Sequence, residues 1–228
     1  MTTALLFDFD GVVVDTEVAT FQAWRDTYAE FGVELSLEDW LPAVGTGSST
    51  SGAFDAVAHL ESLIGAAVDR DELIARRSAR KAELYAKAPL LPGVRERLAE
   101  ARRIGIATAI VTRNRDDRVR TQSDLVGLDH EWDACICANE EPTRDKAELY
   151  RLALAELAVA PADALAFEDS PSGVDAARRA GVRCAAVPND VTRGAAFDDA
   201  TVVLSSLEGH SLAEILALAG DRARPARR

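Results

Sequence analysis

The amino-acid sequence predicts an α/β fold in which a doubly wound parallel sheet carries a helical insertion. Short apolar runs alternate with helical patterns over most of the chain, as is typical of a parallel sheet with helices on both faces. Residues 16–88 differ, because helical periodicity continues through them without an apolar strand. The sequence therefore predicts one sheet domain that is interrupted after its first strand.

The first strand is predicted at residues 4–7, where an apolar run ends at two acidic residues. Asp8 and Asp10 are two positions apart, so in extended backbone their side chains point to the same side. Two like charges about 4 Å apart repel by roughly 4 kcal/mol at an effective dielectric of about 20. A hard divalent cation such as Mg²⁺, which prefers oxygen ligands, would offset this repulsion. Gly11 permits a turn and a close approach of the backbone to a ligand.

The insertion is predicted to be wholly helical, with helices at residues 16–31, 53–64 and 69–86 and a short helix that starts at Ser36 and closes at Pro42. Residues 45–52 are rich in Gly, Ser and Thr, and we interpret them as a loop that touches substrate. The charged run at residues 76–81 indicates a solvated helix face, although one of its cations could reach an anionic substrate.

Strands and helices alternate regularly after the insertion. The predicted strands lie at residues 106–112, 134–137, 164–167, 183–187 and 202–204. The predicted helices lie at residues 94–103, 116–126, 146–158, 171–180 and 212–219. Right-handed crossovers bring the C-terminal ends of all strands to one edge of the sheet, where such sheets bind their ligands.

Polar residues follow two of these strands at that edge. Residues 112–114 read Thr-Arg-Asn at the start of a helix, where free backbone N–H groups bind anions; Thr112 could also serve only as a helix cap. Glu168 and Asp169 follow another strand. Together with the two N-terminal acids they predict four carboxylates converging on one cation.

These residues carry a resemblance to a known family. Residues 8–12 with 15–17, Thr112, Lys146 and residues 168–173 resemble, in order, the four signatures of the haloacid dehalogenase (HAD) superfamily, specifically its phosphatase and phosphomutase branch. The resemblance implies a Rossmann-like core at residues 1–15 and 89–228 and an α-helical cap at residues 16–88.

The resemblance also implies catalytic roles. Asp8 would be the nucleophile that takes up a phosphoryl group, Asp10 the general acid and base, and Thr112 a hydrogen-bond donor to the phosphate. Lys146 would supply a positive charge, although Ala147 stands where Pro usually follows this Lys, and Arg144 is the alternative cation. The implied phosphate-binding group is Gly11, Thr112, Arg113, Asn114 and Lys146.

A metal site for Mg²⁺ follows from the same resemblance. Asp169 would bind the ion directly, and Glu168 directly or through water. Asp8 would contribute a carboxylate oxygen, and Asp10 its main-chain carbonyl.

The predicted function is a magnesium-dependent phosphatase that hydrolyses a small phosphorylated metabolite, such as a sugar phosphate, through an aspartyl-phosphate. A sugar phosphomutase is the alternative, but residues 45–52 contain no cation to hold a second phosphate. A non-catalytic binding module on the same fold is a third interpretation. Candidate substrate contacts from the cap are Glu17, Thr46 and Ser48.

Composition restricts the partners and the compartment. A formal net charge of -12 disfavours binding to nucleic acid or to an anionic membrane surface. The N-terminal region shows no secretory signal, and three cysteines are an odd number, which favours a reducing cytoplasm. Cys135 and Cys137 could bind a metal, but their apolar surroundings favour small core residues. The sequence leaves monomer and dimer open.

Overall fold

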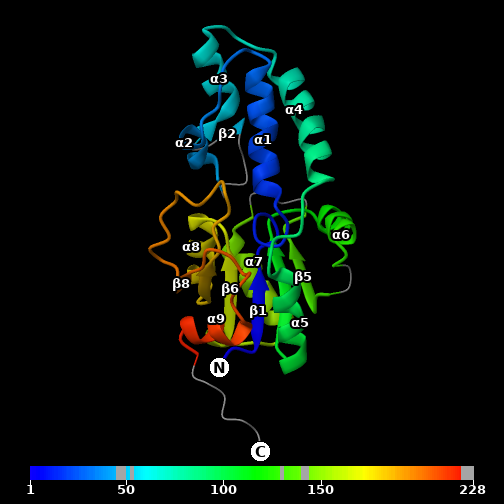
Figure 1. Cartoon of the computed structure of the whole chain (residues 1–228), viewed down its shortest axis with the longest axis vertical. Helices are drawn as coiled ribbons and strands as arrows, with labels where there is room; N and C mark the ends of the chain where they lie inside the picture. Colours follow the sequence, from blue (N-terminus) through cyan, green and yellow to red (C-terminus); the bar gives the residue numbers. More distant parts are fainter. Residues whose placement is uncertain (45–49, 52–53, 129–130, 140–143, 222–228) are drawn as a thin grey trace, which may run out of the picture.

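A parallel sheet with a helical layer on each face forms the core of the computed structural model (Figure 1), which describes residues 1–44, 50–51, 54–128, 131–139 and 144–221. Its strands are β1 (Ala4–Phe7), β4 (Ala107–Thr112), β5 (Ala134–Cys137), β6 (Ala164–Glu168), β7 (Arg183–Ala186) and β8 (Val202–Val203). They lie in the order β5-β4-β1-β6-β7-β8, and every pairing is parallel. The predicted doubly wound α/β fold is confirmed.

Five helices of the described chain cover this sheet. They are α5 (Val94–Ile104), α6 (Asp116–Leu125), α7 (Lys146–Glu156), α8 (Pro171–Arg179) and α9 (Leu212–Leu218). Alternate residues of β1 divide between the faces: Leu5 and Phe7 pack with residues of α5, α6 and α9, whereas Ala4 and Leu6 pack with α7 and α8. The central strand β1 is apolar throughout because both of its faces are buried.

The strand register brings the predicted site residues to one edge of the sheet. Phe7 of β1 lies between Ile110 of β4 and Phe167 of β6. Asp8 therefore leaves the sheet next to Glu168 and one residue before the end of β4 at Thr112. Strands added on both sides of β1 create the topological switch point at which such sheets bind ligands.

The insertion between β1 and β4 forms a separate layer over this edge (Figure 1). It contains α1 (Thr16–Ala29), α2 (Leu37–Trp40), a 3₁₀ turn (Leu41–Ala43), β2 (Thr50–Ser51), β3 (Phe54–Asp55), α3 (Ala56–Ile64) and α4 (Arg70–Tyr85). It has an apolar core around Trp24, Tyr28, Trp40 and Leu60, which Val191 joins from the segment after β7.

The prediction of a wholly helical insertion is wrong, because β2 and β3 form a short antiparallel pair. Phe54 and Asp55 take extended backbone, and Asp55 then caps α3 by accepting from the N–H groups of Val57 and Ala58. This cap makes the helix begin at Ala56 rather than at residue 53. Thr46 and Ser48, the predicted substrate contacts, lie outside the described residues.

The charged run on α4 divides between two faces. Arg76 and Arg80 point outward and pair with Glu30 and Asp26 of α1 at 2.9 and 2.7 Å. Arg77 instead lies over the Trp24 ring, and Lys81 lies over the Tyr85 ring with its Nζ 4.6 Å from the centroid. Residues 77, 81 and 85 share one helix face because they are four positions apart.

Two further predictions concern the cysteines and the compartment. Cys184 is buried, and Cys137 packs against the core, but Cys135 is exposed, so its interpretation as a core residue is wrong. It lies on the outermost strand of the sheet, where one side of the strand has no neighbour.

Within the described residues no helix is long and apolar enough to cross a membrane. The cytoplasmic location stays a prediction.

The Asp55 cap should contribute measurably to stability. We expect Asp55→Ala to lower the free energy of unfolding by about 1 kcal/mol, the usual contribution of an N-cap side chain. Asp55→Asn keeps the capping oxygen but loses the ion pair to Arg70, whose Nη2 is 2.7 Å from Oδ2. It should therefore cost much less, as measured by urea unfolding. Equal losses in the two variants would show that the ion pair, not the cap, stabilises α3.

Candidate active site

Asp8 occupies the centre of the candidate site, directly after β1. Its backbone N–H donates to the carbonyl of Phe167 at 3.0 Å, which keeps it attached to β6. Its Oδ1 accepts from the N–H of Phe9 at 2.7 Å, and its Oδ2 lies 2.6 Å from Nζ of Lys146. The carboxylate is thus oriented by two charge-assisted contacts, as a nucleophile requires.

Lys146 is the cation of the site. It is the first residue of α7, which Asp145 caps, and it is 5% exposed. Its Nζ lies 2.7 Å from Oε1 of Glu168 as well as against Asp8. Burial disfavours its charge, but these two carboxylates outweigh burial and raise the pKa of Lys146. Arg144 pairs with Glu148 at 2.7 Å instead, so the geometry favours Lys146 over the alternative cation.

Three carboxylates gather at this point. Asp8, Glu168 and Asp169 each offer an oxygen, and these oxygens lie within 4.8 Å of one another. Burial, followed by the charges of neighbouring carboxylates, raises the pKa values of Asp8 and Asp169 well above their usual range. Three carboxylates beside the single ammonium of Lys146 leave two formal negative charges, the amount that a divalent cation would neutralise.

The donor atoms fit a hard cation. Oε1 of Glu168 accepts from Nζ of Lys146 and from the hydroxyl of Tyr150 at 2.6 Å, whereas the buried Oε2 has no hydrogen-bond partner among the described residues. A buried carboxylate oxygen without a partner is costly unless a ligand binds it. These oxygens are the ligand type that Mg²⁺ selects.

The Asp10 carboxylate faces the end of β4. Its Oδ1 accepts from the Thr16 hydroxyl at 2.7 Å, and its Oδ2 accepts from Nδ2 of Asn114 at 3.1 Å and from the Thr112 hydroxyl at 3.4 Å. Its side chain is not part of the three-carboxylate group, so the expected convergence of four carboxylates is wrong for Asp10. Metal binding by its main-chain carbonyl stays a prediction.

Thr112 and Asn114 are joined in one turn, because the N–H of Asn114 donates to Oγ1 of Thr112 at 3.1 Å. Arg113 lies between them and is partly exposed. Gly11 has a φ of 81°, and a Cβ added there would lie 2.2 Å from Oδ2 of Asp169. Only glycine therefore lets the loop after Asp10 approach the carboxylates.

Three contacts were missed from the sequence. Asn189 donates to Oδ2 of Asp169 at 2.7 Å, Tyr150 donates to Glu168, and Thr16 donates to Asp10. Asn189 follows β7 at the ligand-binding edge of the sheet, and Tyr150 is one helical turn after Lys146. The position after β7 could have indicated Asn189 from the sequence. The spacing of four residues from Lys146 could have indicated Tyr150.

Glu17 and Lys81 bring charges from the insertion toward the site. Burial, and then the charge of Asp10, raises the pKa of Glu17 to about 7. Burial lowers the pKa of Lys81 to about 8, against the opposing charges of Asp10 and Glu17. Each group therefore lies close enough to Asp10 for the charges to interact, although α1 and α4 belong to the insertion.

Comparisons with known proteins identify the family of this chain. The family model described as haloacid dehalogenase-like hydrolase matches residues 5–187. The chain is 34% identical over 217 residues to the putative phosphatase YhcW of Bacillus subtilis, covering 95% of this chain and 97% of YhcW. It is 29% identical to hexitol phosphatase B of Escherichia coli, covering 94% of each protein.

One solved structure with a similar fold contains a ligand. It is CbbY from Rhodobacter sphaeroides in complex with xylulose-(1,5)bisphosphate, with 27% identity and a TM-score of 0.71. The match covers 94% of this chain and 99% of the CbbY chain. The likeness therefore includes both the sheet and most of the insertion.

The buried carboxylates should make stability depend on pH and on Mg²⁺. An acid whose pKa is higher in the folded than in the unfolded protein contributes its full stabilisation at pH values below its pKa in the unfolded chain, about 3.9. This contribution is lost as the pH rises through the pKa of the folded protein. At neutral pH in EDTA we expect Asp169→Asn to raise the free energy of unfolding by about 1–2 kcal/mol. At pH 4 the gain should shrink, and Mg²⁺ should stabilise the wild type but not this variant.

Urea unfolding at both pH values measures this effect, with the exposed Asp198 changed to Asn as a matched control. Equal stabilisation of the wild type and Asp169→Asn by Mg²⁺ would contradict a metal site at Asp169.

Proposed function

This chain belongs to the haloacid dehalogenase-like hydrolases, and we propose that it is a magnesium-dependent phosphatase acting on phosphate monoesters of small metabolites. One observation carries the proposal: the oriented Asp8 carboxylate lies against Lys146 within a group of three carboxylates that could hold a divalent cation. A nucleophile, a cation and a candidate Mg²⁺ site at the end of one strand are what phosphoryl transfer requires.

In the first step an oxygen of Asp8 attacks phosphorus, and the bond from phosphorus to the leaving oxygen breaks. Asp10 donates a proton to that oxygen, which leaves as an alcohol. In the second step Asp10 takes a proton from water, the water oxygen attacks phosphorus, and the aspartyl-phosphate bond breaks. Inorganic phosphate is released, and Asp8 and Asp10 return to their starting states.

The neighbouring residues assist both steps. Lys146 holds Asp8 and offsets negative charge on the transferring group. The hydrogen bond from the Thr112 hydroxyl to Asp10 is long, at 3.4 Å. The hydroxyl can therefore turn to a phosphate oxygen at little cost, while Asn114 keeps Asp10 in place. Asp8, Glu168 and Asp169 would hold Mg²⁺, which supplies charge stabilisation to the phosphoryl oxygens.

We assign Lys81 and Glu17 to recognition of the leaving group. They come from two different helices of the insertion, and Asp10 interacts electrostatically with both. A cation and a carboxylate suit a leaving group with hydroxyls and a further anionic group. Phosphorylated sugars and polyols have this chemistry, and the relatives include a hexitol phosphatase and a protein that binds a sugar bisphosphate.

The nucleophile and the cation are tested by three substitutions. We expect Asp8→Asn to lower kcat/KM for phosphate release by more than about 10³-fold, since no covalent intermediate can form. Lys146→Met should lower it about 10²- to 10³-fold. Arg144→Met, whose guanidinium pairs with Glu148, is the matched control and should keep near wild-type activity.

Activity is measured as phosphate released from a panel of sugar and polyol phosphates, with Mg²⁺ and with EDTA. Full activity of Asp8→Asn, or full activity in EDTA, would contradict the proposal. An isomerised sugar phosphate without phosphate release would instead indicate a phosphomutase.

Lys81 should give the pH profile its alkaline limb. Because the pKa of Lys81 is about 8, kcat/KM should fall as pH rises through this value and the cation is lost. Lys81→Arg keeps the charge and should move the limb to higher pH, whereas Lys81→Met should raise KM about 10- to 100-fold. Arg80→Met on the outward face is the control. An alkaline limb that stays in place in Lys81→Arg would exclude this role.

A further inference from the structure

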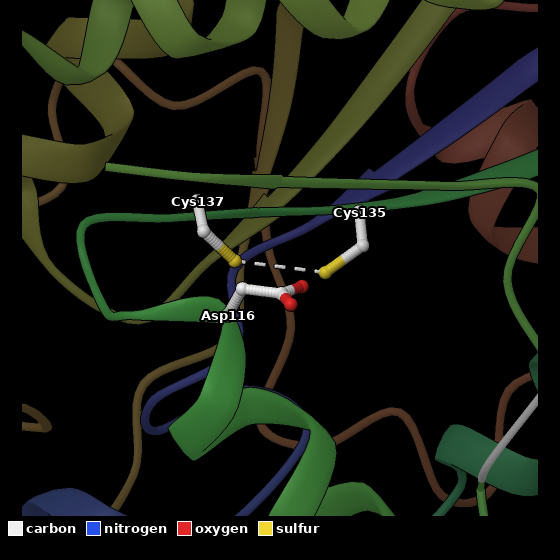
Figure 2. A group of neighbouring side chains, drawn as sticks. All are labelled: Asp116, Cys135 and Cys137. Atoms are coloured by element: carbon white, nitrogen blue, oxygen red, sulfur yellow. Dashed lines mark hydrogen bonds between the residues drawn. The ribbon is translucent and has the colours of Figure 1, made fainter. Parts of the chain in front are cut away.

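A second group of possible metal ligands lies on the outer strand of the sheet (Figure 2). Cys135 and Cys137 of β5 and Asp116 of α6 each offer one ligand atom, and these atoms lie within 4.8 Å of one another. None of the three residues belongs to the proposed phosphatase site. Unlike that site, this group contains two sulfur atoms, so it would select a different class of ion.

The strand and the helix bring these residues together. Cys135 and Cys137 are two positions apart on β5, so their side chains point to the same side of the strand. Thr112 pairs with Cys137, and after Thr112 the chain turns and begins α6 at Asp116. Figure 2 shows that the Asp116 carboxylate reaches toward the two sulfur atoms.

The separation of the sulfur atoms fits a metal better than a disulfide. The Sγ atoms are 3.6 Å apart, whereas two thiolates bound to a tetrahedral Zn²⁺ at about 2.3 Å lie about 3.8 Å apart. A disulfide needs about 2.05 Å, with Cα atoms usually about 4.4–6.8 Å apart. Residues two apart in a strand are separated by about 6.6 Å, near the upper end of this range, and the sulfur atoms at 3.6 Å are well beyond bonding distance.

We propose that Cys135, Cys137 and Asp116 form a binding site for a thiophilic divalent cation such as Zn²⁺. Two thiolates and one carboxylate provide three ligands, and water would complete a tetrahedron on the exposed side of Cys135. Both thiols would give up their protons when the metal binds, because the thiolate is the form that ligates a metal.

Arg120 opposes binding at this site. Its Nε lies 2.6 Å from Oδ2 of Asp116, so it occupies one possible ligand oxygen and adds a positive charge. A bound cation would connect β5 to the first residue of α6, and so would flank residues 113–115. This segment includes Asn114, which holds Asp10. Metal binding would therefore stiffen the turn that supports the proposed acid and base.

The proposal is tested on the reduced full-length chain with Cd²⁺ as a spectroscopic probe and Zn²⁺ as the competitor, in excess Mg²⁺. Wild type should show a sulfur-to-cadmium charge-transfer band that saturates at one ion per chain and is reversed by Zn²⁺. The oxygen ligands of Asp8, Glu168 and Asp169 cannot produce this band. Cys135→Ser and Cys137→Ser should each abolish it, whereas Cys184→Ala, which alters the buried cysteine, should keep it.

Two further variants separate the carboxylate from the thiols. Asp116→Asn should weaken Cd²⁺ binding about tenfold or more. Arg120→Gln should strengthen it about two- to fivefold, because Asp116 is released from the ion pair. A gain of affinity cannot result from misfolding, so this variant keeps the test decisive.

The proposal would be overturned by the absence of the band in wild type, or by its persistence in Cys135→Ser. The proposal would also be overturned if a Cys135–Cys137 disulfide formed completely in air despite saturating Zn²⁺. Such a disulfide is seen as a mass loss of two hydrogens.

Discussion

The buried contact between Lys146 and the carboxylates of Asp8 and Glu168 is the interaction on which the site depends. Lys146 lies within 2.7 Å of both acids and is almost fully buried. Removing one partner of such a group would leave an uncompensated buried charge, which is strongly destabilising. Because Asp169 adds a further carboxylate, the ammonium group alone does not balance the charge. The same imbalance that weakens the fold makes the site suitable for a divalent cation.

The sheet topology determines where this charge collects. Asp8 follows β1 in the middle of the sheet, Glu168 ends β6 on one side of it, and the Thr112 turn follows β4 on the other side. The insertion begins directly after Asp15 and ends before α5, so its helices lie over the same edge. Glu17 and Lys81 can therefore act on Asp10 although they belong to helices α1 and α4 of the insertion.

Cations placed at this edge matter for a chain with a net charge of -12. Most arginines of α4 pair with acids on the surface, as Arg76 and Arg80 do with α1. Exposed pairs of this kind contribute little to stability. By contrast, Lys146 is buried and Lys81 is half-buried, and a charge away from solvent acts more strongly on an anionic substrate. Local charge, rather than the net charge, would therefore determine the affinity for phosphate.

The sequence by itself determined the parallel α/β fold, the positions of most strands and helices, and the gathering of Asp8, Glu168 and Asp169 at one edge of the sheet. It could do so because apolar periodicity reports burial of each element, and parallel strands bring their C-terminal ends to one edge. The sequence did not predict the β2–β3 pair. Asp55 ends the extended segment by capping α3, and hydrophobic periodicity does not show how strongly a cap fixes the start of a helix.

Only the tertiary structure placed Lys146 against Asp8 and paired Arg144 with Glu148. It also turned the Asp10 carboxylate toward Asn114 and brought Asn189 to Asp169. Each outcome depends on side-chain directions and on contacts between residues far apart in the chain. The same reason explains the exposed thiol of Cys135, since only the strand order places β5 at the edge of the sheet, beside Asp116.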